Sequence, residues 1–265
     1  MTRLYRFEHQ SRISYGIEQP GENGPDPVLS ILAGSPFEPL PATGDLVPLS
    51  KVRLLSPCVP TKIVAVGLNY RDHAVERNKP VPAEPMIFLK PQTAVIGHGE
   101  DIIYPKMSKR VDYEGEMGVV IGRRTYQLAD SDRTDDYILG FTCVNDVTAR
   151  DLQERDVQYG RAKGFNTFAP IGPAIVSGID SGALAIETKL NGKVKQSSNT
   201  RNLIFNVDYL VRFVSWVMTL EPGDVISTGT PSGIGPMSPG DHVEVTIEKI
   251  GTLGNTVMKV REGRT

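Results

Sequence analysis

The sequence predicts an α+β protein that is predominantly β, with a small β-rich domain at its N-terminus. Three observations lead to this prediction. Apolar runs of strand length, bounded by Gly, Pro and Asn turns, recur along most of the 265 residues. Only three stretches have the patterning of a helix. The first 55 or so residues are also richer in Gly, Pro and turn dipeptides than the remainder.

The composition argues against several classes of protein. Lys and Arg total 29 against 31 Asp and Glu, a net charge of −2, and no long basic run offers a footprint for nucleic acid. No apolar stretch approaches transmembrane length, and MTRLYRFEHQ lacks the apolar core of a signal peptide. Cys58 and Cys143 form no metal-binding pattern and are interpreted as buried thiols in a reducing compartment. We therefore expect a cytoplasmic protein with neither nucleic acid nor membrane as a partner.

The N-terminal domain is predicted to span residues 1–58. In it the strand-like pieces RLYRFEH and VLSILA lie between the turn-rich segments EQPGENGPDP and AGSPFEPLPATGD. A linker is expected near LLSPCVPTK, where the texture of the sequence changes. The remaining residues, 59–265, are predicted to form one larger domain.

The larger domain reads as a succession of strands with a few helices between them. An Asn-Gly pair in AIETKLNGK predicts a hairpin there. The predicted strands cover residues 62–67, 86–91, 111–122, 137–144, 173–178, 185–193, 224–229 and 242–251. The predicted helices cover residues 69–78, 148–159 and 207–220.

Three carboxylates are the strongest candidates for a metal site. Glu114 and Glu116 lie two residues apart in a predicted strand, so their side chains point to the same face. Two like charges that close are unfavourable unless a cation lies between them or they share a proton. Asp146 ends the next apolar run, and three carboxylates suit Mg²⁺ or Mn²⁺. Spacing alone leaves open a solvated strand face with unrelated acids.

His73, Glu76 and Lys163 are candidate catalytic residues. If RDHAVE is helical, His73 and Glu76 share a face, and the carboxylate would raise the basicity of the imidazole and fix its tautomer. A chance pair on a surface helix remains an alternative. Lys163 lies among small and apolar residues in GRAKGFNTFAP, where it could donate to an oxyanion or carry a proton. Its alternative is a solvated loop lysine.

Two positions near Asp146 are candidates for binding substrate. Gln153 follows Asp146 by seven residues, which is two turns along one helix face. It could reach a substrate carboxylate or a metal-bound water. Arg150, four residues after Asp146, could instead be a structural ion-pair partner of that carboxylate.

The loop STGTPSGIGP, residues 227–236, is a candidate anion cradle. It follows a predicted strand, and exposed N–H groups around Gly229 and Thr230 could bind a carboxylate. It lacks the spacing and the lysine of a phosphate-binding P-loop. A plain connecting turn is the alternative.

Taken together, these segments resemble the fumarylacetoacetate hydrolase family. The match runs from about Lys62 to about Val257 through GLNYRDHAVE, MIFLKP, the E-G-E strand, NDVTARDLQ, RAKGFNTFAPIGP and TLEPGDVISTGTPSGIGP. The resemblance implies a mixed β-sandwich roll and a homodimer. It also implies a cation held by Glu114, Glu116 and Asp146, a His73–Glu76 dyad on a lid, and Lys163 and Gln153 facing the substrate.

The resemblance implies an enzyme that acts on 2-oxo carboxylates with Mg²⁺ or Mn²⁺. Because the dyad could activate water, hydrolysis of a carbon–carbon bond in an acylpyruvate or fumarylpyruvate-like substrate is favoured. The alternatives are isomerisation of 2-hydroxyhepta-2,4-diene-1,7-dioate, or decarboxylation of 5-oxopent-3-ene-1,2,5-tricarboxylate or of oxaloacetate. A non-catalytic ligand-binding module with a structural cation is a remoter one. Leu68 stands where many relatives carry Arg, which leaves one binding or structural charge open.

Overall fold

A computed structural model describes residues 1–20, 26–38, 41–76 and 78–260. Within these residues most of the regular structure is β, arranged in three sheets with four α-helices outside them. The predicted fold class, α+β and predominantly β, is therefore confirmed.

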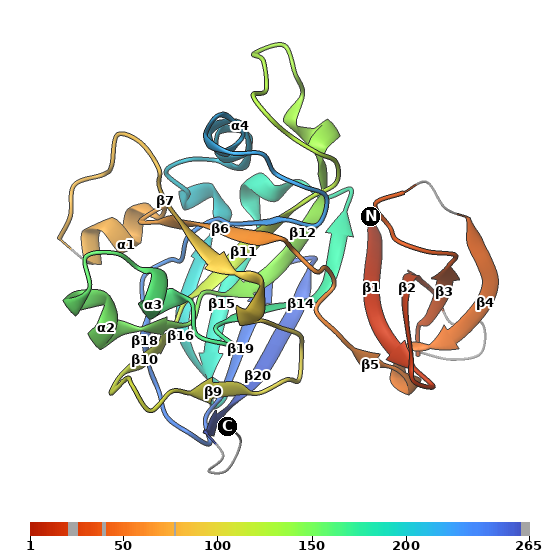
Figure 1. The fold of residues 1–265 in the computed structure, drawn as a ribbon, viewed down its shortest axis with the longest axis horizontal. Helices are drawn as coiled ribbons and strands as arrows, with labels where there is room; N and C mark the ends of the chain where they lie inside the picture. Colours follow the sequence, from red (N-terminus) through yellow and green to blue (C-terminus); the bar gives the residue numbers. More distant parts are fainter. Residues whose placement is uncertain (21–25, 39–40, 77, 261–265) are drawn as a thin grey trace.

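The N-terminal segment forms one end of the large sheet with five antiparallel strands, drawn in red and orange in Figure 1. Its strands are β1 (Thr2–His9), β2 (Arg12–Gln19), β3 (Val28–Leu32), β4 (Ala42–Pro48) and β5 (Arg53–Leu54). β1 also pairs with β14 (Ala169–Ser177), in the register that joins Thr2 to Ser177 and Leu4 to Ile175. Backbone hydrogen bonds thus connect the N-terminal strands with the large sheet of the rest of the chain.

The large sheet continues from β14 through five further strands, and a sixth, β8 (Val95–Ile96), pairs with β14 on its own. The five are β12 (Ile138–Asn145), β11 (Gly115–Ile121), β17 (Val225–Ser227), β6 (Lys62–Gly67) and β7 (Met86–Pro91). Every residue of β11 and β17 is buried, and both strands lie in the middle of the sheet. A strand covered on both faces reads as a continuous apolar run, which is why this part of the sequence was readily predicted.

A second sheet packs against the first. Its strands are β16 (Lys193–Asn199), β15 (Ala185–Leu190), β19 (His242–Ile247), β20 (Gly251–Lys259) and β9 (Ile102–Tyr104). Met117 and Val119 from the large sheet share one apolar core with Ile186 and Val245 from the second sheet. This arrangement is a mixed β-sandwich, as expected. The predicted hairpin is also present, because Asn191 and Gly192 connect β15 to β16 with φ angles of 52° and 74°.

A third, short sheet lies next to the candidate site. It contains β13 (Thr148–Ala149), β10 (Val111–Tyr113) and β18 (Gly235–Met237). The prediction of one helix over residues 148–159 is therefore wrong at its start. Thr148 and Ala149 pair with β10, and the Arg150 N–H donates to the carbonyl of Arg110 at 2.8 Å. These long-range backbone bonds override the local helical pattern, which resumes as α2 (Arg150–Arg155). The predicted helix also ends four residues early, and the separate helix α3 (Gly160–Lys163) begins just beyond the predicted range.

The other two predicted helices are present, and their observed ends differ from the predicted ends by only a few residues. α4 (Val207–Val217) begins at Asn206, whose side chain accepts a hydrogen bond from the Tyr209 N–H at 2.9 Å. It ends before residue 220, and it lies along one side of the sandwich (Figure 1). α1 (Arg71–Glu76) is the core of the helix predicted for residues 69–78, of which residue 77 lies outside the described residues.

The turn Pro222-Gly223-Asp224 ties the start of β6 to β17 through its aspartate. The buried carboxylate accepts hydrogen bonds from the Thr61 N–H at 2.8 Å, the Thr61 hydroxyl at 2.7 Å and the Glu221 N–H at 2.9 Å, and it pairs with Lys62. Asp224→Ala leaves these donors without an acceptor, so we expect a loss of about 3–5 kcal/mol in the free energy of unfolding. Urea unfolding would measure this loss. Asp241→Ala is the control, because Pro239-Gly240-Asp241 is a turn of the same sequence at a more exposed position. An equal loss in both variants would contradict this account.

Both cysteines are buried, as their interpretation from the sequence requires. Burial raises the pKa of the Cys58 thiol and of the Cys143 thiol to about 12. Because the thiolate is the reactive form, neither cysteine should react with a disulfide reagent in the folded protein at pH 8. Both should react after unfolding in urea, and rapid labelling of either thiol in the native protein would contradict the placement.

Candidate metal and active site

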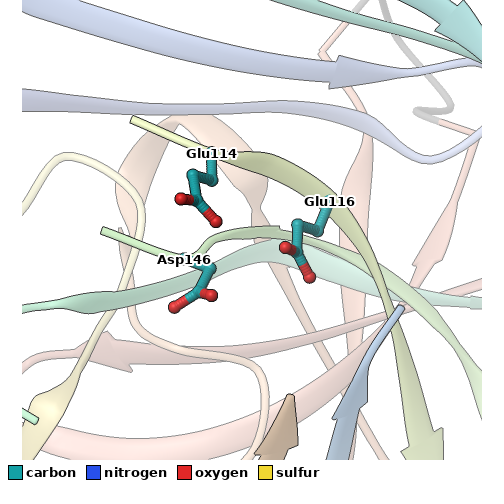
Figure 2. Close-up of side chains that lie close together, drawn as sticks. All are labelled: Glu114, Glu116 and Asp146. Atoms are coloured by element: carbon teal, nitrogen blue, oxygen red, sulfur yellow. The ribbon is translucent and has the colours of Figure 1, made fainter. Parts of the chain in front are cut away.

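The three predicted carboxylates come together in the structure. Figure 2 shows Glu114, Glu116 and Asp146 pointing toward one another, and one oxygen of each lies within 4.8 Å of the others. Glu114 lies between β10 and β11, Glu116 lies in β11, and Asp146 directly follows β12. All three side chains are buried. The cluster thus lies where the sequence predicted it, although the single strand predicted for residues 111–122 is interrupted at Glu114, because β10 and β11 belong to different sheets.

Backbone contacts between two neighbouring strands fix the triad. The Asp146 N–H donates to the carbonyl of Glu114 at 2.9 Å, and the Glu114 N–H donates to the side-chain oxygen of Asn145 at 3.0 Å. Gly115 leaves room for the second sheet, because a Cβ there would lie 2.1 Å from the hydroxyl of Thr188. The small residue between the two glutamates is thus required by packing.

Three buried cations surround the triad. Lys163 bridges Glu114, at 2.9 Å, and Asp146, while Lys90 pairs with the other oxygen of Asp146. Arg150 pairs with Glu114. Burying charges is unfavourable unless they are paired and hydrogen-bonded, and these contacts provide that compensation.

The compensation is uneven across the triad. Burial alone would raise the pKa of Glu114, but Lys163 and Arg150 hold it well below its ordinary value. Burial and the charges of Asp146 and Glu114 instead raise the pKa of Glu116 to about 8. Glu116 has no cationic partner in the described part of the chain, so it can release its proton and carry a full charge only if a cation is added. A divalent cation among the three carboxylates would neutralise that charge, so the donor set fits Mg²⁺ or Mn²⁺.

Glu116 is oriented by the loop that was predicted to bind a substrate anion. Its carboxylate accepts hydrogen bonds from the Ser227 hydroxyl and from the Gly229 N–H at 2.8 Å. The N–H of Gly229 therefore has a carboxylate partner within the chain. Gly229 has φ of +96°, and a Cβ there would lie 2.7 Å from that of Asn69. The loop thus supports a candidate metal ligand, whereas the predicted anion cradle would need that N–H to be open.

A cavity opens above the triad and contains most of the other predicted residues. His73, Gln153, Lys163 and Thr230 line it, as does Arg150. The rest of its lining is formed by Val66, Gly67, Leu68, Lys79, Met86, Phe88, Glu114, Glu116, Asp146 and Tyr159. Leu68, the position that differs from many relatives, therefore places an apolar side chain in the wall.

The His73–Glu76 pair forms as predicted, on the short helix α1. His73 Nδ1 lies 2.8 Å from a carboxylate oxygen of Glu76, whose other oxygen accepts the Gly233 N–H at 3.0 Å. His73 is only 8% exposed. A buried imidazole at the cavity, held by a carboxylate that is itself anchored, differs from the chance surface pair that the sequence left open. With Nδ1–H donated to Glu76, Nε2 is the nitrogen left to accept a proton.

Arg150 and Gln153 lie at the site, but for a reason other than the predicted one. Asp146 precedes α2 and is not on its helical face, so the spacing argument was wrong. Arg150 does not pair with Asp146; it donates to Asp112 at 2.9 Å and also to Glu114 and Gln153. The side chain of Gln153 is thereby held at the cavity by Arg150.

Lys90 is the site residue that the sequence did not reveal. It lies in MIFLKP on β7, and its side chain is fully buried against Asp146 and the carbonyl of Val147, the latter at 3.1 Å. Burial and the charge of Lys163 lower its pKa despite the opposing effect of Asp146. The only signal in the sequence is one lysine within an apolar strand, which usually marks a solvated strand face.

Comparisons with known proteins agree with this geometry. Residues 62–258 match the family model described as fumarylacetoacetate (FAA) hydrolase, C-terminal, and residues 2–57 match one described as Rv2993c-like, N-terminal. An uncharacterized protein of Archaeoglobus fulgidus is 60% identical over 81% of this chain and 85% of its own length. The oxaloacetate tautomerase YisK of Bacillus subtilis is 41% identical over 79% of this chain and 74% of its own.

Solved structures show the same fold. A 2-hydroxyhepta-2,4-diene-1,7-dioate isomerase from Mycobacterium marinum superposes with a TM-score of 0.90 at 41% identity, over all of both chains. A fumarylpyruvate hydrolase from Pseudomonas aeruginosa, in complex with Mn²⁺ and pyruvate, superposes with a TM-score of 0.71 at 29% identity, over 77% of this chain and 91% of that one.

None of the described helices has the length and apolar character needed to cross a membrane.

Proposed function

Because the chain belongs to the fumarylacetoacetate hydrolase family, we propose that it is an enzyme that moves a proton beside the keto group of a 2-oxo carboxylate, with Mg²⁺ or Mn²⁺ as cofactor. The observation that carries the proposal is the convergence of Glu114, Glu116, Asp146 and Lys163 in one cavity. Relatives named as an oxaloacetate tautomerase and a dioate isomerase support proton transfer as the reaction class.

The residues have separate tasks in this proposal. Glu114, Glu116 and Asp146 would hold the divalent cation. The cation would supply Lewis-acid stabilisation of the negative charge that develops on the keto oxygen. Lys163, which is buried at the triad and lines the cavity, would carry the proton to and from the adjacent carbon. Phe88, whose ring centroid lies 5.1 Å from the Lys163 Nζ, would help to keep that ammonium away from bulk water.

Hydrolysis of a carbon–carbon bond is the second candidate, and the His73–Glu76 pair favours it. Hydrolysis needs a base that activates water, in addition to the groups that stabilise an enolate. The buried imidazole at the cavity has the orientation and the carboxylate partner of such a base. An acylpyruvate or fumarylpyruvate-like compound remains the proposed substrate class for this reaction.

We also propose a homodimer, which light scattering on the purified protein would test.

Exchange of substrate protons with solvent deuterium tests the first candidate. The protein should catalyse exchange at C3 of oxaloacetate in the presence of Mg²⁺ or Mn²⁺ and lose this activity in a chelator. Parallel assays with acylpyruvates and hydroxymuconate-type dioates would define the preferred substrate. If no 2-oxo acid shows metal-dependent exchange or turnover, the proposed function is wrong.

His73→Ala should separate the two candidate reactions. Removing a general base typically lowers a rate by about 10²–10⁴-fold, so cleavage of an acylpyruvate should fall by this amount. Exchange at C3 should remain, because it depends on the metal site and Lys163. If both activities fall together, His73 acts in the proton transfer itself; if neither falls, the dyad has no catalytic task.

A further inference from the structure

Lys79 is the one cationic side chain of the cavity lining that has no acidic partner among the residues that the structure describes. The other two, Lys163 and Arg150, are bound to triad carboxylates. Lys79 is exposed and lies on the segment that links α1 to β7. Lys79 therefore brings to the cavity lining a positive charge that no described acidic side chain pairs with.

The end of α1 fixes the backbone of Lys79. The Lys79 N–H donates to the carbonyl of Ala74 at 3.0 Å, and the Asn78 N–H donates to that of Val75 at 3.0 Å. Asn78 has φ of +50°. This pair of hydrogen bonds around a residue in the left-handed region is the Schellman motif that terminates helices. Because α1 also carries His73, these hydrogen bonds join Lys79 directly to the helix that carries the dyad.

The surroundings of Lys79 suggest what it binds. Val66, Leu68, Met86 and Phe88 give the cavity lining an apolar part beside its charged and polar residues. A 2-oxo carboxylate needs the triad region for its keto and carboxylate oxygens only. A second carboxylate, at the other end of the substrate, would be taken out of water beside these apolar side chains and would need a cation as partner.

We propose that Lys79 binds the distal carboxylate of a 2-oxo dicarboxylate and makes the enzyme prefer dicarboxylates over the matching monocarboxylates. This inference rests on the proposed function and assigns the substrate specificity of the enzyme to Lys79. Lys79 makes no bond to the reacting atoms in this view, so its effect is on substrate binding and not on the proton transfer. Arginine at this position would preserve the preference, because it keeps the charge and the hydrogen-bond donors.

Calorimetric binding to the Mg²⁺-loaded protein tests the proposal without requiring turnover. The probes are two pairs that differ only in the terminal group: 2-oxoglutarate with 2-oxopentanoate, and 2-oxoadipate with 2-oxohexanoate. A hydrogen bond to a charged group corresponds to about a 10- to 100-fold preference for at least one dicarboxylate in the wild type. Lys79→Met should remove this preference by weakening dicarboxylate binding alone, and Lys79→Arg should restore it. Lys193→Met, at the exposed Asn-Gly hairpin, is the matched control and should change nothing.

Asn78 provides a second, independent variant. Valine is strongly disfavoured at positive φ, so Asn78→Val should disturb the turn and weaken the preference, whereas Asn78→Gly should keep it. Equal affinity of the wild type for both members of each pair would overturn the assignment of Lys79. So would a loss of mono- and dicarboxylate binding to the same extent in Lys79→Met. If the metal-loaded wild type binds none of the four probes, the proposed function itself fails, and with it this inference.

Discussion

Glu116→Gln is expected to abolish divalent-cation binding and to lower turnover by about 10³-fold or more. Glutamine fills the same space but removes one of the three negative charges that would hold the cation. The Ser227 hydroxyl and the Gly229 N–H can still donate to its amide oxygen, so the fold should persist. Calorimetric titration with Mn²⁺ would measure the loss of affinity, and Glu187→Gln on the partly exposed strand β15 is the matched control.

Although Glu116→Gln should abolish metal binding, we expect it to leave the metal-free protein as stable as the wild type or more stable. Burial, with Asp146 and Glu114, raises the pKa of Glu116 from 4.5 to about 8 in the folded chain. A carboxyl whose folded pKa lies above its unfolded value destabilises the fold increasingly as the pH rises from about 4.5 toward 8. Without metal, Glu116→Gln should therefore be at least as stable as the wild type at pH 8, with the difference shrinking toward pH 4.5. Unimpaired Mn²⁺ affinity, or unfolding of the metal-free variant, would contradict the assigned role.

Lys163→Met should disable the site through both stability and catalysis. The ammonium group is buried and bridges Glu114 and Asp146, and their charges raise its pKa although burial alone would lower it. Its removal leaves Asp146 with Lys90 alone and Glu114 with Arg150 alone, so we expect a loss of about 3 kcal/mol in the free energy of unfolding. As the proposed proton carrier, its loss should also lower exchange at C3 by about 10²–10⁴-fold.

Added metal distinguishes these two effects of Lys163. Saturating Mg²⁺ should restore much of the stability of Lys163→Met, because the cation replaces the missing positive charge between the carboxylates. It should not restore the exchange activity, because a metal ion does not replace the proton carrier. Denaturant unfolding and deuterium exchange, each with and without Mg²⁺, measure the two effects. Full activity of the metal-loaded variant would show that Lys163 is only a structural counter-ion, and Lys193→Met controls for the loss of a lysine elsewhere.

Local sequence patterns were sufficient for much of the fold and for the centre of the site. Buried central strands such as Lys62–Gly67 appear as continuous apolar runs, and the Asn191-Gly192 pair specifies its hairpin through backbone conformation alone. The period of two along a strand placed Glu114 and Glu116 on one face without knowledge of any neighbour. The i, i+3 spacing placed His73 beside Glu76 in the same way.

Only the tertiary structure decided which backbone and side-chain partners come from distant parts of the chain. The helix predicted from residue 148 begins at Arg150 because Thr148 and Ala149 pair with β10. Arg150 binds Glu114 and Asp112 instead of the nearby Asp146 for the same reason.

Lys90 shows most clearly what local sequence patterns cannot predict. Its strand comes 56 residues before the carboxylate that it binds, and lysine in a strand is ordinarily solvated. Periodicity describes which face of an element a side chain occupies. Which element covers that face, and which charges it brings, depends on long-range packing. The sequence by itself therefore determined the carboxylate pair and the local dyad of this protein, whereas the folded chain determined the cations and donors that hold them in place.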